Sequence, residues 1–167
     1  IKPACSSAMK FAKKLQDELC LEWAHGYIDY KGLKKVLKRE DDEGMSLFCS
    51  ILELQLSKVH RFMTGQQRAI NDEIIPLRPN LGSQVQILEA SRAGDRLVDH
   101  IERFRDFAHL NQMAIRKIIK KFDKRFQVQY VESIGLPDLA GRLVHVSEVV
   151  TWLLDPARNA LKLIRSA

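Results

Sequence analysis

Cysteine is scarce in this sequence. Only three cysteines occur among 167 residues, and no two of them form a CxxC pair: Cys5, Cys20 and Cys49. An odd number of unpaired thiols argues against a disulfide framework of the kind that stabilises small secreted domains. We therefore expect free thiols in a reducing cytosol.

Long apolar runs are also missing. No run approaches the ~20 residues that a membrane-spanning helix requires, and the opening IKPACSSA lacks the apolar centre of a signal peptide. We expect residues 1–8 to be a native extension or a cloning remnant. Residues 9–167 are then expected to form one helical domain, because their length and apolar content suit a single core.

The motifs of common catalytic and nucleotide sites are absent as well. The sequence contains no GxxxxGKS/T, GxGxxG, HExxH or GxSxG pattern. The five histidines show no ligand spacing, and the acidic run 41–43 is interpreted as a solvated loop rather than a metal cluster. The sequence therefore predicts no catalytic residue and no metal site, and it favours a binding protein over an enzyme.

Helical periodicity fills most of the chain, and no useful strand alternation occurs. It predicts an all-α fold with an N-terminal helical hairpin against a bundle of longer helices. The first short helix has apolar residues four apart: Phe11, Leu15 and Leu19. After a turn at Gly26, Asp29 is the expected N-cap of the second helix, which the acidic run 40–44 is expected to end.

Longer helices follow. One apolar stripe is expected to run at least to Ile70 and to end before Pro76, and 76–83 is the clearest loop. Ser83 is a candidate cap for the next long helix, and Asn111 for a separate helix after it. The buried face of that helix would be Ile115, Ile118, Ile119 and Phe122. A last helical region is expected over 144–164.

The formal charge is +6, and lysine recurs with the helical spacing i, i+3, i+4, i+7 in two distant segments. In YIDYKGLKKVLKRE (27–40) these are Lys31, Lys34, Lys35 and Lys38. In AIRKIIKKFDKRF (114–126) these are Lys117, Lys120, Lys121 and Lys124. Packing the isoleucines of the second segment would present its lysines outward. A solvated charged face is the alternative interpretation, but acidic neighbours are nearly absent, with Asp123 alone among six basic residues over 116–125.

Tyr30 and Lys34 are four residues apart, so they point the same way on a helix. If the two lysine helices cross, this pair meets the second lysine stripe. Two unit charges about 6 Å apart repel by roughly 3 kcal/mol at an effective dielectric near 20, so such a patch suits a ligand with several phosphates. Nucleic acid or an anionic membrane surface is the alternative partner. The basic segments, however, lack interleaved aromatics, and the apolar faces are needed for the core.

Several segments together resemble the SPX domain family. They are MKFAKKL from Met9, EWAHGYIDYKGLKK, IRKIIKKFDK, and FCSILELQLSKVHRF, in which Gln55 or Leu56 replaces the usual acid. The resemblance covers about Met9 to Phe126 in recognisable motifs. It implies an N-terminal helical hairpin packed on a three-helix bundle with two long helices.

The resemblance also implies a sensor of inositol polyphosphates and inositol pyrophosphates that reports cellular phosphate status. The phosphate-binding residues carried over are Tyr30, Lys34 and Lys121, with a surrounding cluster of Lys117, Lys120 and Lys124. Lys10 matches a further lysine, at a helix start near Met9 whose free N–H groups suit an anion. No cofactor is implied beyond this ligand, and no nucleic acid is expected.

The family occurs as a module, so the expected partner is an attached or separate effector. The classes implied are a polymerase, transporter, phosphodiesterase, ubiquitin ligase or transcription regulator. Membrane contact is expected only through a parent protein. The expected location is the cytoplasm, or the cytosolic face of a membrane protein.

Overall fold

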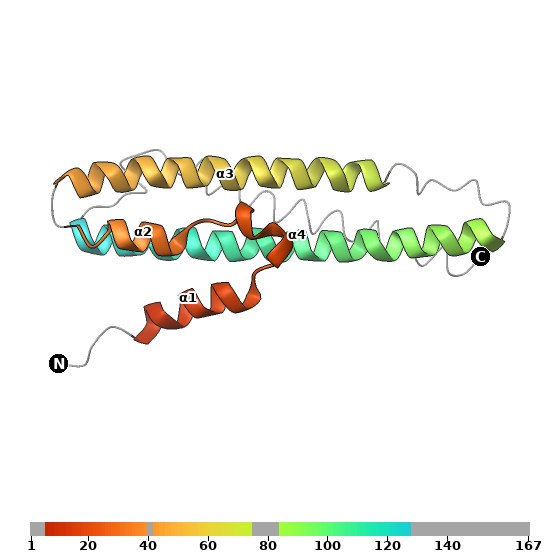
Figure 1. The fold of residues 1–167 in the computed structure, drawn as a ribbon, viewed down its shortest axis with the longest axis horizontal. Coiled ribbons are helices and arrows are strands. Elements are labelled where there is room, and N and C mark those ends of the chain that lie inside the picture. Colours follow the sequence, from red (N-terminus) through yellow and green to blue (C-terminus); the bar gives the residue numbers. More distant parts are fainter. Residues whose placement is uncertain (1–5, 40–41, 75–83, 128–167) are drawn as a thin grey trace.

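The computed structural model describes residues 6–39, 42–74 and 84–127, and the all-α prediction is confirmed for them. The helices in order are α1 (Ser6–Glu18), the 3₁₀ helix η1 (Leu21–Gly26), α2 (Tyr30–Val36), α3 (Asp42–Ile74) and α4 (Gln84–Phe126) (Figure 1). The predicted loop 76–83 with Ser83, and the predicted helix over 144–164, lie outside these residues. In the described ranges, no helix combines the length and the apolar character needed to cross a bilayer.

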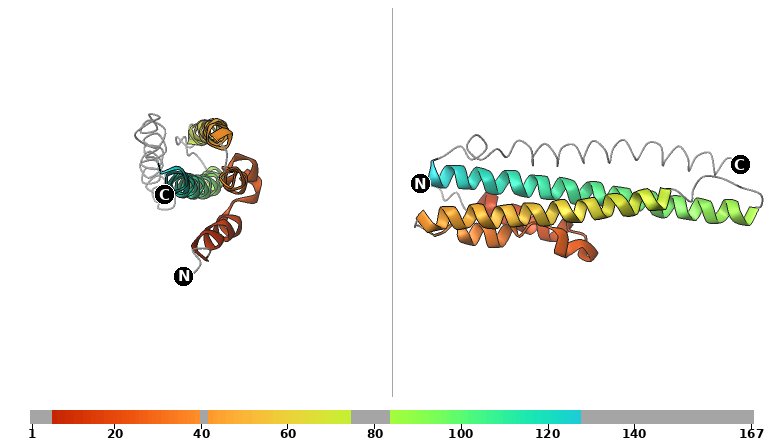
Figure 2. Two further views of the ribbon diagram at one scale, coloured as in Figure 1. Left: turned by 90° about the vertical axis from the view of Figure 1, so that its left-hand side faces the viewer. Right: turned by 90° about the horizontal axis from the view of Figure 1, so that it is seen from above.

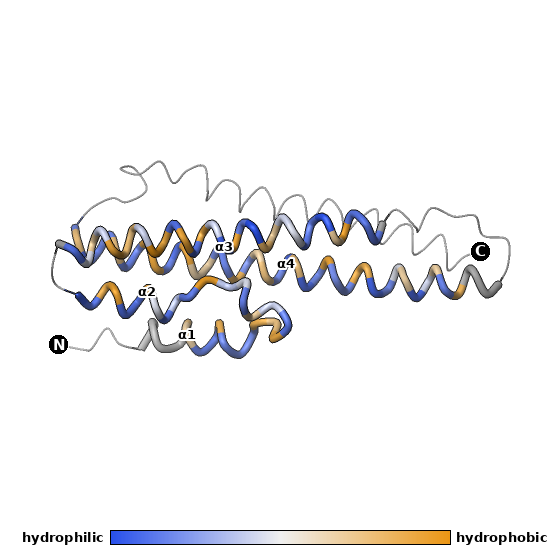
Figure 3. Tube along the Cα trace, turned by 45° about the horizontal axis from the view of Figure 1, so that its top comes forward, coloured by the Kyte–Doolittle hydropathy of each residue, from blue (hydrophilic) through white to orange (hydrophobic). Residues whose placement is uncertain are grey.

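The two long helices, α3 and α4, run side by side in opposite directions, as both Figure 1 and Figure 2 show. Along each helix apolar residues recur every three to four positions, the spacing that places them on one face (Figure 3). Phe48 of α3 stacks on Phe122 of α4, with ring centroids 4.7 Å apart. Farther along, the His100 ring of α4 lies 2.8 Å from oxygens of both Gln66 and Glu73 on α3. Apolar packing and polar contacts therefore both join the pair.

The N-terminal hairpin packs against this pair. α2 contacts both α3 and α4, and η1 contacts α3. Aromatic rings fill the junction under η1, where Trp23 lies edge-on to both Phe62 of α3 and Phe107 of α4. The Arg103 guanidinium covers Trp23 and also contacts Glu22 at 3.2 Å. This arrangement confirms the expected hairpin and fixes the start of α2 against the bundle.

The structure corrects the prediction that Asn111 caps a separate helix. α4 continues unbroken through this position, and Asn111 is fully buried. Its Nδ2 donates to the carbonyl of Phe107 at 2.9 Å, and its Oδ1 accepts from the backbone N–H of Ile28 at 2.9 Å. The amide therefore satisfies a buried donor of the hairpin, which is why a polar side chain lies in the core here.

The end of α2 differs from the one expected. α2 ends at Val36, with Leu37 as its C-cap, so Lys38 lies beyond the helix. α3 begins at Asp42, inside the acidic run. Acidic residues suit this position because a helix N-terminus carries a partial positive charge. At its other end, α4 finishes where Gln127 takes a φ of 52°, a left-handed conformation common after helix ends.

Gly26 is required where η1 meets α3. An added Cβ would lie 2.7 Å from the Phe62 ring, closer than packed carbon atoms tolerate. We expect Gly26→Ala to lower the free energy of unfolding by about 1–3 kcal/mol through overpacking. Urea unfolding would measure this loss. Gly65→Ala is the matched control, because nothing lies near an added Cβ there. Equal stability of the two variants would contradict the packing argument.

Candidate functional site

The expected site is built around the start of α2. Asp29 caps this helix as predicted, because its Oδ1 accepts from the N–H of Gly32 at 2.8 Å. The backbone N–H of Asp29 in turn donates to Gln55 of α3 at 2.9 Å. These two bonds fix the helix start, and Tyr30, the first residue of α2, is 2% exposed. Lys34, one turn further, is half-buried.

The second lysine segment forms the last turns of α4. Its apolar residues are buried as predicted: Ile115, Ile118, Ile119 and Phe122. Lys117, Lys120 and Lys124 are exposed, whereas Lys121 is half-buried. Packing therefore divides the stripe into one lysine held at the edge of the core and three lysines in solvent.

Phe11 of α1 joins the two segments. Its ring lies edge-on to Tyr30 with centroids 5.1 Å apart, and the Lys117 ammonium lies over the same ring at 5.0 Å. Tyr30 of α2 and Lys117 of α4 therefore both contact the Phe11 ring. The two helices run in the same direction here (Figure 1), so the step from Tyr30 to Lys34 parallels the step from Lys117 to Lys121.

The structure differs from the expected helix start at Met9, since α1 begins at Ser6. Its unpaired N–H groups therefore belong to residues 6–9. Lys10 lies within α1, next to Phe11, and its side chain lies outside the described part. The sequence indicated that Phe11 is apolar, but not that it lies between Tyr30 and Lys117.

The Tyr30 hydroxyl is buried and has no hydrogen-bond partner among the described residues. A buried polar group left unpaired carries a desolvation cost of about 1–3 kcal/mol. The Tyr30 ring packs edge-on against Phe11 of α1. No group of three or more metal-ligating side chains occurs in the described ranges.

Burial raises the pKa of Tyr30 above its ordinary value of 10.0, and burial likewise raises the pKa of Tyr27. We expect an ultraviolet titration of the folded protein to show these two phenols ionising late, and Tyr30→Phe to remove one of them. The folded state favours the neutral form of each phenol. The resulting contribution to the free energy of unfolding is therefore present below about pH 10 and is lost as the pH rises through the pKa of the phenol in the folded state. Ionisation of both at the ordinary pKa would contradict the buried positions.

The family model described as the SPX domain matches residues 9–44. An SPX domain-containing membrane protein of Arabidopsis thaliana is 31% identical over 140 residues, which cover 72% of this chain and 19% of that protein. The vacuolar transporter chaperone complex subunit 4 of Schizosaccharomyces pombe is 30% identical over 134 residues, covering 70% of this chain and 19% of the relative. The chain thus spans about a fifth of the length of the curated relatives it matches.

A solved structure has the same fold. It is the SPX domain of Chaetomium thermophilum glycerophosphodiester phosphodiesterase 1 in complex with inositol hexakisphosphate. The TM-score is 0.77 at 23% sequence identity, and the match covers 93% of this chain and 99% of that one.

Proposed function

Since this chain belongs to the SPX domain family, we propose that the junction of α1, α2 and α4 binds an inositol polyphosphate. The observation that carries the proposal is that Phe11 brings Tyr30 and Lys117 together at the point where two lysine-bearing helices meet. The structural relative that shares the fold was solved with inositol hexakisphosphate, which fits the same ligand class.

The proposed contacts divide by burial. Tyr30, Lys34 and Lys121 would contact phosphate oxygens directly. Lys34 and Lys121 are half-buried and so lose little side-chain freedom on binding, and the buried Tyr30 hydroxyl has no hydrogen-bond partner among the described residues. Lysine suits this role as a point charge without a fixed geometry. The exposed cluster of Lys117, Lys120 and Lys124, together with Lys10, would add longer-range attraction.

The expected mechanism is electrostatic. The ligand phosphates would neutralise repulsion among the lysines and tie α2 to the last turns of α4. As a module of a longer protein, the domain would report phosphate status to an attached or partner effector through the altered contacts. Relatives named as membrane proteins and as a vacuolar complex subunit are compatible with a place on the cytosolic face of a membrane. Under this proposal the domain is a binding module and not itself an enzyme.

Calorimetric titration tests the proposal directly. We expect inositol hexakisphosphate to bind at one site per chain and inorganic phosphate to bind at least about a hundredfold more weakly. The reason is that each additional charge-assisted contact contributes about 1.5–3 kcal/mol, and 1.4 kcal/mol is a factor of ten. An inositol pyrophosphate is the third ligand to compare, and we expect it to bind most tightly. Similar affinities for inorganic phosphate and inositol hexakisphosphate would refute a site built for several phosphates.

A further inference from the structure

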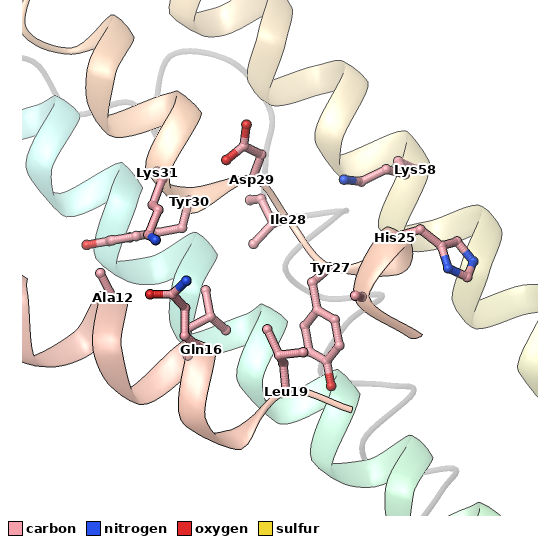
Figure 4. Close-up of a pocket in the computed structure, with 12 residues that line it drawn as sticks. Ala12, Gln16, Leu19, His25, Tyr27, Ile28, Asp29, Tyr30, Lys31 and Lys58 are labelled. Carbon is pink, nitrogen blue, oxygen red and sulfur yellow. The ribbon is translucent and has the colours of Figure 1, made fainter. Parts of the chain in front are cut away.

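A pocket lies between the hairpin and α3, and no residue of the proposed phosphate-binding lysine set lines it. Its volume is about 300 Å³. Figure 4 shows its walls: Gln16 comes from α1, Leu19 follows directly after α1, Asp29 precedes α2, and Lys58 reaches in from α3. Tyr30 also lines this pocket, so the two sites share one side chain, but their cations come from different helices.

Lys58 places a partly buried positive charge in the wall of this pocket. It is half-buried, and burial lowers the pKa of its ammonium more than the nearby Asp29 carboxylate raises it. Figure 4 shows the ammonium directed toward Asp29. Within the part of the chain that the structure describes, however, no carboxylate lies within ion-pair distance of it. Oδ1 of Asp29 is already bonded to Gly32. The ammonium is thus partly desolvated, and Asp29 attracts it only from beyond ion-pair distance, so an anion in direct contact would offset the desolvation.

The rest of the lining indicates which kind of group would accompany the anionic group of a ligand. Leu15, Leu19 and Ile28 provide apolar walls, and Lys31 adds a second cation at the rim. The volume is at the lower end of the range for small-molecule pockets, about 300–1,000 Å³, which are mostly apolar with a few placed polar groups. An inositol polyphosphate fits poorly, because its several phosphates would face the leucines.

We propose that this pocket binds a small monoanion with a compact apolar body, of the class of short-chain carboxylates. Lys58 contacts the carboxylate, and Leu15 and Leu19 contact the apolar part. Because α1 supplies one wall and α3 supplies the cation, the bound anion bridges the hairpin and the bundle.

Hexanoate is a suitable probe, with 1-hexanol and hexylamine as matched neutral and cationic ligands. We expect hexanoate to shift the backbone amide resonances of Gln16, Ala24 and Asp29, and to bind about tenfold or more tightly than the other two, since only it forms a charge-assisted contact with Lys58. Lys58→Met keeps the apolar stem and should reduce hexanoate binding to the level of hexanol. Circular dichroism should show the same helical content for this variant as for the unaltered protein, which shows that it folds.

A second variant keeps the test valid if Lys58→Met is unstable. Gln16→Trp changes an exposed residue of α1 and should fill the pocket, so that neither hexanoate nor hexanol binds. Equal affinity for hexanoate and hexanol, unchanged hexanoate binding in Lys58→Met, or shifts confined to residues 117–124 would each overturn the proposal. None of these results depends on whether the phosphate site is correct.

Discussion

Replacing Lys34 or Lys121 by alanine is expected to weaken inositol hexakisphosphate binding by about ten- to a hundredfold, with helical content unchanged. Both lysines are half-buried, and each variant would lose one charge-assisted hydrogen bond to phosphate, worth about 1.5–3 kcal/mol. A factor of ten corresponds to 1.4 kcal/mol. Titration calorimetry measures the affinity, and circular dichroism measures the helical content.

The matched control is Lys35→Ala, which removes an exposed lysine from the same helix. The change in net charge equals that of Lys34→Ala, so any difference between the two variants reports position rather than total charge. We expect at most a few-fold loss for Lys35→Ala, because exposed charges interact weakly and are screened by salt. If Lys34→Ala, Lys121→Ala and Lys35→Ala all reduce affinity equally, the protein attracts polyanions through its net charge, and the assigned contacts are wrong.

The exposed lysines of α4 allow a graded version of this experiment. Lys117, Lys120 and Lys124 are in solvent, so alanine at these positions should reduce affinity less than at Lys121. The loss should also shrink as salt is raised, because the Debye length falls from about 10 Å at 0.1 M to about 3 Å at 1 M. Lys117 has an additional role, since its ammonium covers Phe11.

The sequence predicted the elements of the fold well because helical periodicity carries that information directly. The stripe of α3 and the buried isoleucines of α4 follow from 3.6-residue spacing, and Asp29 follows from cap preference. What failed was the prediction that Asn111 caps a separate helix. Asn111 resembles a cap by residue type, but the side chain is buried. Its hydrogen-bond partner, Ile28, lies 83 positions away in the sequence. Local propensity contains no term for such a contact.

The site shows the same limit. The two lysine segments could be read from spacing, and the pairing of Tyr30 with Lys34 from one helical turn. Which lysines are half-buried depends on how α2 and α4 pack, and the place of Phe11 depends on where α1 lies against them. Both depend on tertiary packing, which the helical spacing in the sequence does not report. The pocket at Lys58 was missed for a related reason: a single lysine in a helix gives no sequence signal, and its partial burial arises only when the hairpin closes over α3.

Asn111→Ala should give a large loss of stability, about 2–4 kcal/mol in the free energy of unfolding. The variant leaves the buried N–H of Ile28 without an acceptor, which costs about 1–3 kcal/mol, and it vacates volume in a fully buried position. Urea unfolding measures the total. Hydrogen exchange of the Ile28 amide isolates the first contribution, and we expect that amide to lose protection.

The matched control for this variant is Asn71→Ala, at an exposed position of α3. Both substitutions exchange asparagine for alanine inside a long helix and share the same gain in helix propensity, so their difference measures the buried contacts. Because Ile28 lies two residues before Tyr30, freeing its N–H should also loosen the start of α2 and reduce inositol hexakisphosphate affinity several-fold. Full stability with an unchanged Ile28 exchange rate would mean that Asn111 does not hold the hairpin, and the position of Tyr30 over α4 would need another cause.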